Sequence, residues 1–583
     1  MLDHLLLKVQ LQFHQHCCYY STLLLLLLLL LLLLLCYSYY SDHANCCFVF
    51  DFQDSTSTTK MDCLKHLLLL AVYCCKLQTS HANTVYIFNV DEPKACGSVA
   101  NNITIAVNSS IHEIDAKYLS VALGSKRVGI NFLGSQKMIN LAAALAPLEL
   151  RLGGTSANFM TYYPAASSHG TPNNCNIDED VDEDDESMLE DTAFYLTAYT
   201  WGSFTSFLKK ANWDLLFDVN NFKWTPSGTW DTTNLEQLLN DSSAKGINIS
   251  HFQLGNEPNA YKGNFGFTIE SETLAANFKT LKAVISKYPL YASSKICGPD
   301  VANVEFTGNS VGYLTGFLNA GAYDVIDEIC LHHYYFGGRD AKLADYLSTT
   351  HMDRLKLLYQ ATTQITNATP RPRPVQLTET AASYGGGTVG MSDAYAGGFL
   401  WLDKLGLSAK MKATRIFRQA LIGASYGLVT SSFDPNPDYY LSLVFKTLVE
   451  GPVFDVTVGT KNDKLRLYAN CASNRRYSPG ALVVYYLNVA DTDAVLSLSQ
   501  FPDANLDLYM LSGGDEGLLS RSVKLNGNKL VMTGNELPAL TAKAHTGDVT
   551  VEAQTFGFIV VPTAGVEFCV NYFAKLDSSS QDK

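Results

Sequence analysis

Short apolar runs alternate with amphipathic stretches from about residue 117 to 435. The amphipathic stretches, such as 235–245, 274–288 and 355–365, carry apolar residues at the spacing of one helix face. Strands and helices that alternate in this way form parallel β/α units. The apolar runs lie at 148–152, 215–219, 249–254, 296–301, 326–335, 375–380 and 415–421. Seven or eight such units predict an α/β fold, a (β/α)8 TIM barrel with its active site at the C-terminal ends of the strands.

The region from about 453 to 572 instead shows short alternating strands, separated by turn signals such as Asn526-Gly527. This pattern predicts a C-terminal β-sandwich. Its strand-like runs lie at 464–471, 481–488, 494–498, 506–511, 523–525 and 555–561. We expect a leader at 1–80, a segment at 81–116 that packs on the sandwich, a catalytic barrel at 117–440, a β-sandwich at 441–572 and a tail at 573–583.

Two apolar runs mark the leader. Residues 23–35 are thirteen consecutive leucines, whereas a membrane-spanning helix needs about 20 apolar residues. A second run follows Met61, with Lys65 ahead of its apolar part and a polar exit near residues 80–83, which is typical of a secretory signal. We expect secretion or lysosomal delivery, with Met61 as the working start or the upstream segment also removed. Membrane anchoring by the leucine run is the alternative.

Composition narrows the range of functions. The 583 residues carry a formal net charge of −14, which argues against general binding to nucleic acid or to anionic membrane surfaces. The acidic run at 177–191 is expected to be a solvated loop of the barrel rather than a calcium site, because it has no glycine at the EF-hand position.

The cysteines indicate no metal site. Eight of the 14 lie in the leader, and the others show no C-x-x-C pair and no zinc-ligand spacing. We therefore expect no metal and no cofactor. Cys297 and Cys330 lie inside apolar runs and are expected to be buried thiols. Cys471 and Cys569 both fall in the C-terminal β-rich region and could form a disulfide there. Glycosylation sequons, which agree with a secreted chain, begin at Asn102, Asn108, Asn240, Asn248 and Asn367.

Two glutamates sit where a glycosidase needs them. In the stretch 251–259 an apolar run ends at Asn256-Glu257 and is stopped by Pro258, and a second run ends at Glu379. Retaining glycosidases use one carboxyl as nucleophile and another as acid and then base. A single glutamate at a strand end is more often a solvated carboxylate or a helix cap. Two glutamates in matching contexts favour catalysis.

Polar groups near these glutamates suggest a sugar-binding cleft. His332 and His333 are adjacent, so their side chains point to opposite faces of a strand and do not chelate one metal. One histidine is expected to face the cleft with Tyr334 while the other packs behind it; a core role for both is the alternative. The glycines in Ser-Tyr-Gly-Gly-Gly at 383–387 let backbone N–H groups approach a ligand.

These motifs resemble those of the heparanase-like family 79 glycoside hydrolases. The resemblance runs from about residue 117 to 571. Its segments are 150–155, 254–259, 298–301, 332–339, 378–380 with 384–387, 398–409, 418–419 and 434–439.

The resemblance implies a retaining endo-β-glucuronidase that hydrolyses internal glucuronic acid linkages of a glycosaminoglycan, with heparan sulfate as the first candidate. It assigns Glu257 as acid/base and Glu379 as nucleophile, and it pairs Cys471 with Cys569. A mildly acidic pH optimum follows, because the acid must stay protonated beside a second carboxylate. The implied substrate-binding residues are Asn256, Thr155, His332, Tyr334, Arg339, Tyr384 and Gln419, together with the backbone N–H groups of Gly385 and Gly386.

Departures from the vertebrate members leave the substrate open. Residues 302–309 contain no Lys or Arg where those enzymes carry a basic cluster, and 121–124 lack an aspartate. The loop after Phe159 is short and acidic, so the chain is expected to work uncut. These features, with 155–158 and 436–439, are similar to the leech hyaluronidases of the same family. Hyaluronan is therefore the alternative substrate, and a non-catalytic glycosaminoglycan-binding protein or an exo-β-glucuronidase are the alternative functions.

Overall fold

A computed structural model describes residues 100–583 except 130, 165–191, 305–307, 460–461 and 582–583. The chain divides into two compact units, 1–94 and 95–583, and the described residues all belong to the second. The expected leader at 1–80 and the acidic run at 177–191 lie outside the described residues. No helix in the described part of the chain is both long and apolar enough to cross a membrane.

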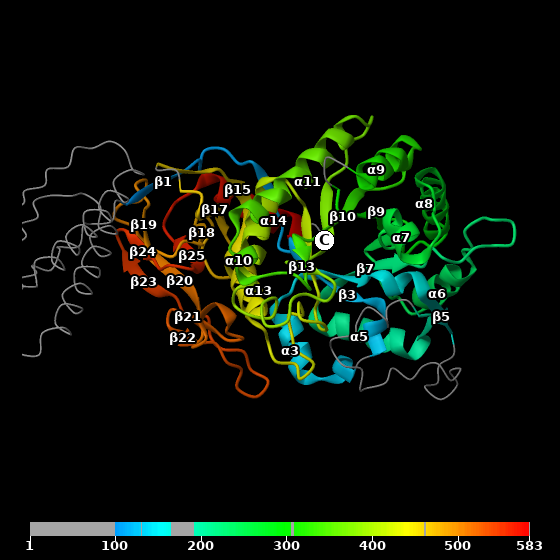
Figure 1. Cartoon of the computed structure of the whole chain (residues 1–583), viewed down its shortest axis with the longest axis horizontal. Helices are drawn as coiled ribbons and strands as arrows, with labels where there is room; N and C mark the ends of the chain where they lie inside the picture. The colour runs from blue at the N-terminus through cyan, green and yellow to red at the C-terminus, as the bar shows by residue number, and fades with distance from the viewer. Residues whose placement is uncertain (1–99, 130, 165–191, 305–307, 460–461, 582–583) are drawn as a thin grey trace, which may run out of the picture. The chain divides into compact units, whose positions relative to one another are not determined.

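A closed barrel of parallel strands forms the first half of this unit (Figure 1). The strands follow one another around the barrel in sequence order, and the last pairs with the first. This confirms the predicted (β/α)8 barrel. The strands are β3 (Leu119–Gly124), β4 (Leu148–Gly153), β7 (Trp213–Val219), β8 (His251–Leu254), β9 (Lys295–Ala302), β10 (Glu328–His333), β12 (Val375–Thr380) and β14 (Arg415–Gln419).

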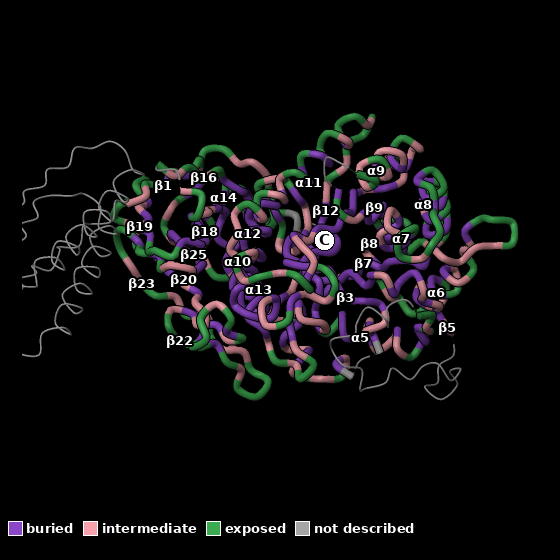
Figure 2. Tube along the Cα trace, viewed as in Figure 1, coloured by how far each residue is buried: buried purple, intermediate pink, exposed green. Residues whose placement is uncertain are grey.

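Helices return the chain from each strand to the next. Several begin at a hydroxyl side chain that accepts from a free backbone N–H of the first turn, as Thr197 does from Thr200 and Ser348 from His351. The helices are α3 (Gln136–Ala144), α5 (Ala198–Ala211), α6 (Thr233–Ala244), α8 (Ser271–Ile285), α9 (Asn309–Asn319), α11 (Thr349–Asn367), α12 (Gly397–Lys410) and α13 (Pro437–Leu448). Figure 2 shows buried residues throughout the barrel strands and around α13, and exposed residues on the outer turns of α8.

Helix α12 lies between the barrel and the C-terminal sheets and is buried on every face up to Lys410. Two of its glycines permit this position. A Cβ at Gly398 would lie 2.5 Å from the ring of Phe556, and one at Gly406 would lie 2.3 Å from the ring of Tyr468. The glycines therefore let aromatic rings of the sandwich pack directly on the helix backbone.

Two sheets pack together to form the C-terminal sandwich. The larger sheet contains β2 (His112–Ile114), β15 (Val449–Phe454), β17 (Leu465–Ala472), β18 (Leu482–Asn488), β25 (Thr555–Val561), β20 (Asn505–Gly513), β21 (Val523–Leu525), β22 (Asn528–Lys529) and β23 (Lys543–Thr546). The smaller sheet contains β16 (Val456–Val458), β1 (Asn101–Ile105), β19 (Ala494–Ser497) and β24 (Val549–Val551). Strands β1 and β2, from the segment expected at 81–116, pair with sandwich strands in both sheets.

Two expected boundaries fall inside helices. The division placed at 440/441 lies within α13, which runs directly into β15. The tail expected at 573–583 is mostly part of α14 (Glu567–Gln581). This helix is anchored on the sandwich by Cys569, Tyr572 and Phe573, which are buried in the core between the two sheets.

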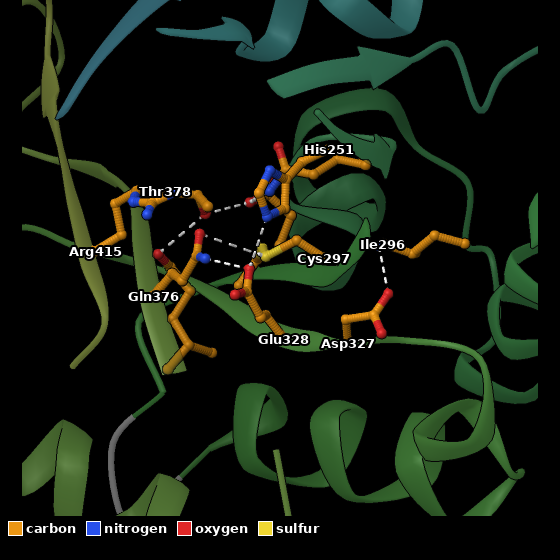
Figure 3. The surroundings of a disulfide bond; sticks show 12 residues. His251, Ile296, Cys297, Asp327, Glu328, Gln376, Thr378 and Arg415 are labelled. Atoms are coloured by element: carbon orange, nitrogen blue, oxygen red, sulfur yellow. Dashed lines mark hydrogen bonds and ion pairs between the residues drawn. A yellow bond between two sulfur atoms is a disulfide. The ribbon is translucent and has the colours of Figure 1, made fainter. Parts of the chain in front are cut away.

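Cys297 and Cys330 are not free thiols: they form a disulfide between the neighbouring strands β9 and β10 (Figure 3). The prediction of burial was right, but that of thiols was wrong, because the pairing depends on strand register. Cys330 lies opposite Pro299, two residues beyond Cys297, and the two Cα atoms are 5.6 Å apart. This separation is within the range that a disulfide bridges. A second disulfide joins Cys471 to Cys569.

Candidate active site

Glu257 and Glu379 meet at the C-terminal end of the barrel. Glu379 lies near the end of β12, and Glu257 follows β8 between Gly255 and Pro258. Glu257 adopts a left-handed conformation (φ 50°), and its N–H donates to the carbonyl of Asp300 at 3.2 Å. Their side chains are 24% and 12% exposed, so both carboxylates can be reached from solvent. One carboxylate oxygen of each glutamate and one ring nitrogen of His332 all lie within 4.8 Å of one another.

Arg151 on β4 organises the floor of this site. Its guanidinium is 1% exposed. It donates to Glu379 Oε2 at 2.9 Å, and Nη2 donates to Asp300 Oδ2 at 2.5 Å and to Asn256 Oδ1 at 2.8 Å. Nε donates to Gln253 at 2.8 Å. One buried cation thus holds the predicted nucleophile and the residue beside the predicted acid/base.

The two aspartates beside Arg151, Asp300 and Asp218, differ in the direction in which their pKa values are shifted. Burial acts to lower the pKa of Arg151, but Asp300 and Glu379 raise it above its ordinary value. Burial acts to raise the pKa of Asp300, but Arg151 and His332 bring it well below its usual range. Asp218 on β7 is 3.5 Å from Arg151, and burial raises its pKa to about 8. Asp218 is therefore protonated at mildly acidic pH while Asp300 is ionised.

His332 links the predicted acid/base to Asp300. Its Nδ1 lies 2.8 Å from Glu257 Oε1, in a hydrogen bond. Its Nε2 lies 3.0 Å from Asp300 Oδ1, a close ion pair without an aligned hydrogen bond. Burial acts to lower the pKa of His332, but Asp300 and Glu379 raise it to about 10. The ring is therefore an imidazolium at acidic and neutral pH, and Nδ1–H donates to Glu257.

Tyr334 completes the setting of Glu379. Its hydroxyl donates to Glu379 Oε1 at 2.7 Å, so both oxygens of this carboxylate are held, one by Tyr334 and one by Arg151. Burial and the neighbouring Glu379 raise the pKa of Tyr334 well above its ordinary value, which keeps the hydroxyl protonated as a donor. An ionised carboxylate fixed in this way is suited to act as a nucleophile.

Asn256 presents a free donor beside the two glutamates. Its Oδ1 accepts from Arg151, while its backbone N–H and C=O exchange 3.4 Å hydrogen bonds with the side-chain amide of Asn158. These contacts fix the orientation of the side-chain amide. Nδ2 makes no hydrogen bond to any residue that the structure describes, and it is available to a substrate hydroxyl.

A glycine-rich loop forms one rim of the site. Short strands β11 (Phe336–Gly337) and β13 (Ser383–Tyr384) pair in parallel, and Gly385 and Gly386 follow with φ values of 72° and 84°. Within the described chain, neither of these two N–H groups donates a hydrogen bond. Tyr384 is 53% exposed, and its ring lies 6.3 Å from that of Tyr334. Arg339 is exposed just beyond β11 and pairs with no described acidic residue.

Other predicted residues have less direct relations to the glutamates. Thr155 begins the 3-10 helix Thr155–Phe159 at the end of β4, and Gln419 ends β14. Gln419 contacts Tyr426 at 3.5 Å, and neither Thr155 nor Gln419 bonds to a glutamate. His333 points away from the site and packs edge-on against Tyr335 at 4.7 Å. Burial, reinforced by Lys404, lowers the pKa of His333, so it is neutral.

The sequence reading gave no role to Arg151, Asp300 or Asp218. The sequence feature that could have identified them is a charged residue inside an otherwise apolar strand. Burying a charge costs free energy unless the charge is paired. The sequence does not show which residue supplies that pair. In the structure, Arg151 of β4 pairs with Asp218 of β7 and with Asp300 of β9 of the same barrel.

A metal ion is not needed to explain the cluster of Glu257, His332 and Glu379, although their donor atoms are close enough to share one. Both ring nitrogens of His332 already face carboxylates, Nδ1 toward Glu257 at 2.8 Å and Nε2 toward Asp300 at 3.0 Å. Arg151 and His332 together balance Asp300 and Glu379. The arrangement is suited to acid–base and nucleophilic chemistry.

The five sequon asparagines are all exposed. Asn102 is in β1, Asn108 follows it, Asn240 is on α6, Asn248 precedes β8 and Asn367 ends α11. Each is therefore accessible for glycosylation.

Comparison with known proteins identifies relatives over most of the chain. Residues 124–406 match the N-terminal domain of glycosyl hydrolase family 79. The heparanase of Bos taurus is 33% identical over 500 residues, which cover 79% of this chain and 91% of the bovine protein. The hyaluronoglucuronidase of Hirudo nipponia is 31% identical over 502 residues, which cover 80% of this chain and 97% of the leech protein.

Solved structures support the fold. The crystal structure of a 4-O-α-L-rhamnosyl-β-D-glucuronidase from Fusarium oxysporum superposes with a TM-score of 0.58. It is 15% identical and covers 79% of this chain and 100% of its own. At this identity the likeness concerns the fold alone.

Proposed function

The chain belongs to glycosyl hydrolase family 79, and from this premise we propose that it is a retaining endo-β-glucuronidase that cleaves internal glucuronic acid linkages of a glycosaminoglycan. It is a glycoside hydrolase. The observation that carries the mechanistic proposal is the approach of a Glu257 oxygen to a Glu379 oxygen within 4.8 Å. Retaining enzymes place these carboxyl groups about 5–5.5 Å apart, whereas inverting enzymes separate them by about 6.5–9.5 Å to admit a water.

The first step breaks the glycosidic bond. Glu379 attacks the anomeric carbon of the glucuronic acid while Glu257 gives its proton to the leaving oxygen. The products are a glucuronyl ester of Glu379, a shortened chain with a new hydroxyl, and an ionised Glu257. Arg151 and Tyr334 keep the carboxylate of Glu379 in one orientation before the attack.

The second step releases the sugar. Ionised Glu257 removes a proton from water, the hydroxide attacks the anomeric carbon, and the bond to Glu379 breaks. Both carboxyl groups return to their starting states, and the sugar keeps its β configuration. The free Nδ2 of Asn256 is placed to donate to the sugar 2-hydroxyl, an interaction that strengthens in the transition state.

Recognition of the sugar carboxylate is assigned to the glycine loop. The N–H groups of Gly385 and Gly386, which donate to no described residue, would donate to that carboxylate. Arg339, exposed just beyond the paired strand β11, adds a positive charge near it. These features support a glucuronic acid at the cleaved linkage.

Heparan sulfate is the first substrate to test, because the bovine relative is a heparanase. Hyaluronan is the second candidate, and a specific observation favours it. Ala302 contacts Asn259 and Asn303 contacts His332. The sequence that begins with these two residues, 302–309, contains no Lys or Arg. A sulfated chain needs cations near the cleft, whereas an unsulfated one does not.

Digestion of both polysaccharides by the purified protein at mildly acidic pH tests the proposal. Shorter heparan sulfate chains with new glucuronic acid reducing ends would identify a heparanase-type activity. Shortening of hyaluronan alone would identify the leech-type activity, and release of single sugars from chain ends would identify an exo-enzyme. Binding without cleavage, unchanged in Glu257→Gln and Glu379→Gln variants, would instead identify a non-catalytic glycosaminoglycan-binding protein.

The proposed route is secretory. Five exposed sequons and two disulfides are features of chains that pass through an oxidising compartment. We place the protein outside the cell or in the lysosome, where it would meet such polysaccharides.

A further inference from the structure

Asp300 is the most heavily bonded carboxylate below the site, yet it does not reach the position of a substrate. It is 1% exposed and has a left-handed backbone conformation (φ 66°). Its Oδ2 accepts from Arg151, and its Oδ1 accepts from Thr378 at 2.6 Å and from Gln253 at 2.8 Å. Oδ1 also lies 3.0 Å from His332 Nε2. Asp300 therefore acts on other residues rather than on the sugar.

We infer that Asp300 is a positioning residue that holds His332 as a cation, so that Nδ1–H of His332 always donates to Oε1 of Glu257 and the exchangeable proton is confined to Oε2 of Glu257. This inference rests on the proposed function and adds to it the atom that carries the catalytic proton.

The contacts of Glu257 support this assignment. Oε1 is occupied by His332 at 2.8 Å, whereas Oε2 bonds to no described residue. If His332 were neutral, its Nδ1 could accept a proton from Oε1, and the acid would then point its proton into the protein. A charged His332 removes this alternative, because an imidazolium has no acceptor. The proton given to the leaving oxygen and the proton taken from water then both pass through Oε2.

The charges that face His332 come from five barrel strands or the loops that follow them. Burial alone would favour neutral imidazole, and the anions must overcome that cost. Asp300 makes the shortest ion pair to Nε2, while Glu379 lies 4.0 Å from Nδ1. The groups concerned are Glu257, Asp300 and Glu379 as carboxyls in contact, Asp218 and Arg151 nearby, and Tyr334 on Glu379.

Asp300→Asn, compared with Asp218→Asn, tests the inference. Both residues are buried carboxyls beside Arg151, but only Asp300 contacts His332. With Asn at 300, His332 loses its main anion and becomes neutral, so ionised Glu257 loses its ion-pair partner. We expect the alkaline limb of the kcat/KM profile to move up by about 1 pH unit. Asp218 is uncharged in this range, so its variant keeps the wild-type limb.

An unmoved limb in Asp300→Asn, or an equal shift in Asp218→Asn, would overturn the inference. A purely structural role for Asp300 would lower kcat/KM at every pH without moving the limb, which is the same negative result. Circular dichroism and thermal unfolding would establish that both variants are folded before the profiles are compared.

A second measurement is made on the wild-type protein and needs no turnover; a variant serves only to assign the signal. Nitrogen-15 NMR of histidine-labelled wild-type protein, with the His332 signal assigned from its loss in His332→Gln, reports the charge of the ring directly. We expect an imidazolium up to about pH 10. Titration near the ordinary value of 6.5 would overturn the inference. Failure to cleave either polysaccharide would instead contradict the proposed function and leave this measurement intact.

Discussion

Arg151 of β4 donates a hydrogen bond of 2.9 Å to Glu379 of β12, and the same guanidinium also donates to Asp300 of β9. The nucleophile is thus tied to a buried cation whose remaining nitrogens hold Asn256 and Gln253. Because every arm of the guanidinium is bonded, its position is fixed before a substrate binds. Such preorganisation is what lets charged groups stabilise a transition state without further rearrangement.

Arg151→Lys is expected to lower kcat/KM by about 100-fold or more, because a lysine keeps the charge but not the planar fork that holds Glu379 and Asp300 together. Arg151→Met is expected to destabilise the protein by about 3–5 kcal/mol, since it leaves buried carboxylates without a partner. Steady-state kinetics and chemical denaturation measure the two effects. Wild-type kinetics in Arg151→Lys would show that the fork is not required.

Glycine variants of the two glutamates should separate their roles. Each is expected to lose about 10²–10⁴-fold in rate. Azide added to Glu379→Gly, with an oligosaccharide carrying a good leaving group, should yield an α-glucuronyl azide, because azide attacks in place of the missing nucleophile. Azide added to Glu257→Gly should yield the β-azide, because it attacks the covalent intermediate. Exchanged products would reverse the assignment of acid/base and nucleophile.

Asp218→Asn is expected to gain stability relative to wild type as the pH rises. Burial raises the pKa of Asp218 from 3.8 to about 8, so the folded protein holds a proton that the unfolded chain has lost. The stability that this proton contributes is present below pH 4 and is lost progressively up to pH 8. We expect similar Tm values at pH 4 and a variant Tm higher by at least about 3 °C at pH 8. A constant difference across this range would refute the buried protonated state.

The two disulfides are expected to contribute unequally. The Cys471–Cys569 disulfide closes a loop with a sequence separation of 98, and the Cys297–Cys330 disulfide closes one of 33. By chain entropy the longer loop stabilises by about 1 kcal/mol more. Paired alanine variants, compared by thermal unfolding, measure this difference. Peptide mapping without reduction should recover both linkages, and a free thiol at Cys297 or Cys330 would contradict the structure.

Local sequence pattern was sufficient to predict the barrel and the location of two glutamates at the C-terminal ends of its strands. The run expected at 375–380 coincides with β12, whose residues from Gln376 to Thr380 are all buried although four of them are polar. The positions of Glu257 and Glu379 could be predicted because Glu257 follows one such strand, β8, and Glu379 lies near the C-terminal end of another, β12.

Long-range pairing could not be predicted in the same way. The partners of Arg151 come from β8, β9 and β12, and the Cys297–Cys330 bridge depends on the register of β9 against β10. The local sequence pattern around Arg151, Cys297 or Cys330 would be the same whichever distant residue each of them contacts. The division expected at 440/441 falls inside α13, which is buried along nearly its whole length and runs directly into β15.

The most direct measurement is a proton NMR time course of cleavage that follows the anomeric signals of the newly formed glucuronic acid reducing ends. If Glu379 forms a covalent intermediate and Glu257 then activates water, the β-anomer appears first and the α-anomer grows in only by mutarotation. Initial release of the α-anomer would show that water displaces the leaving chain directly, and it would contradict a retaining mechanism through Glu379.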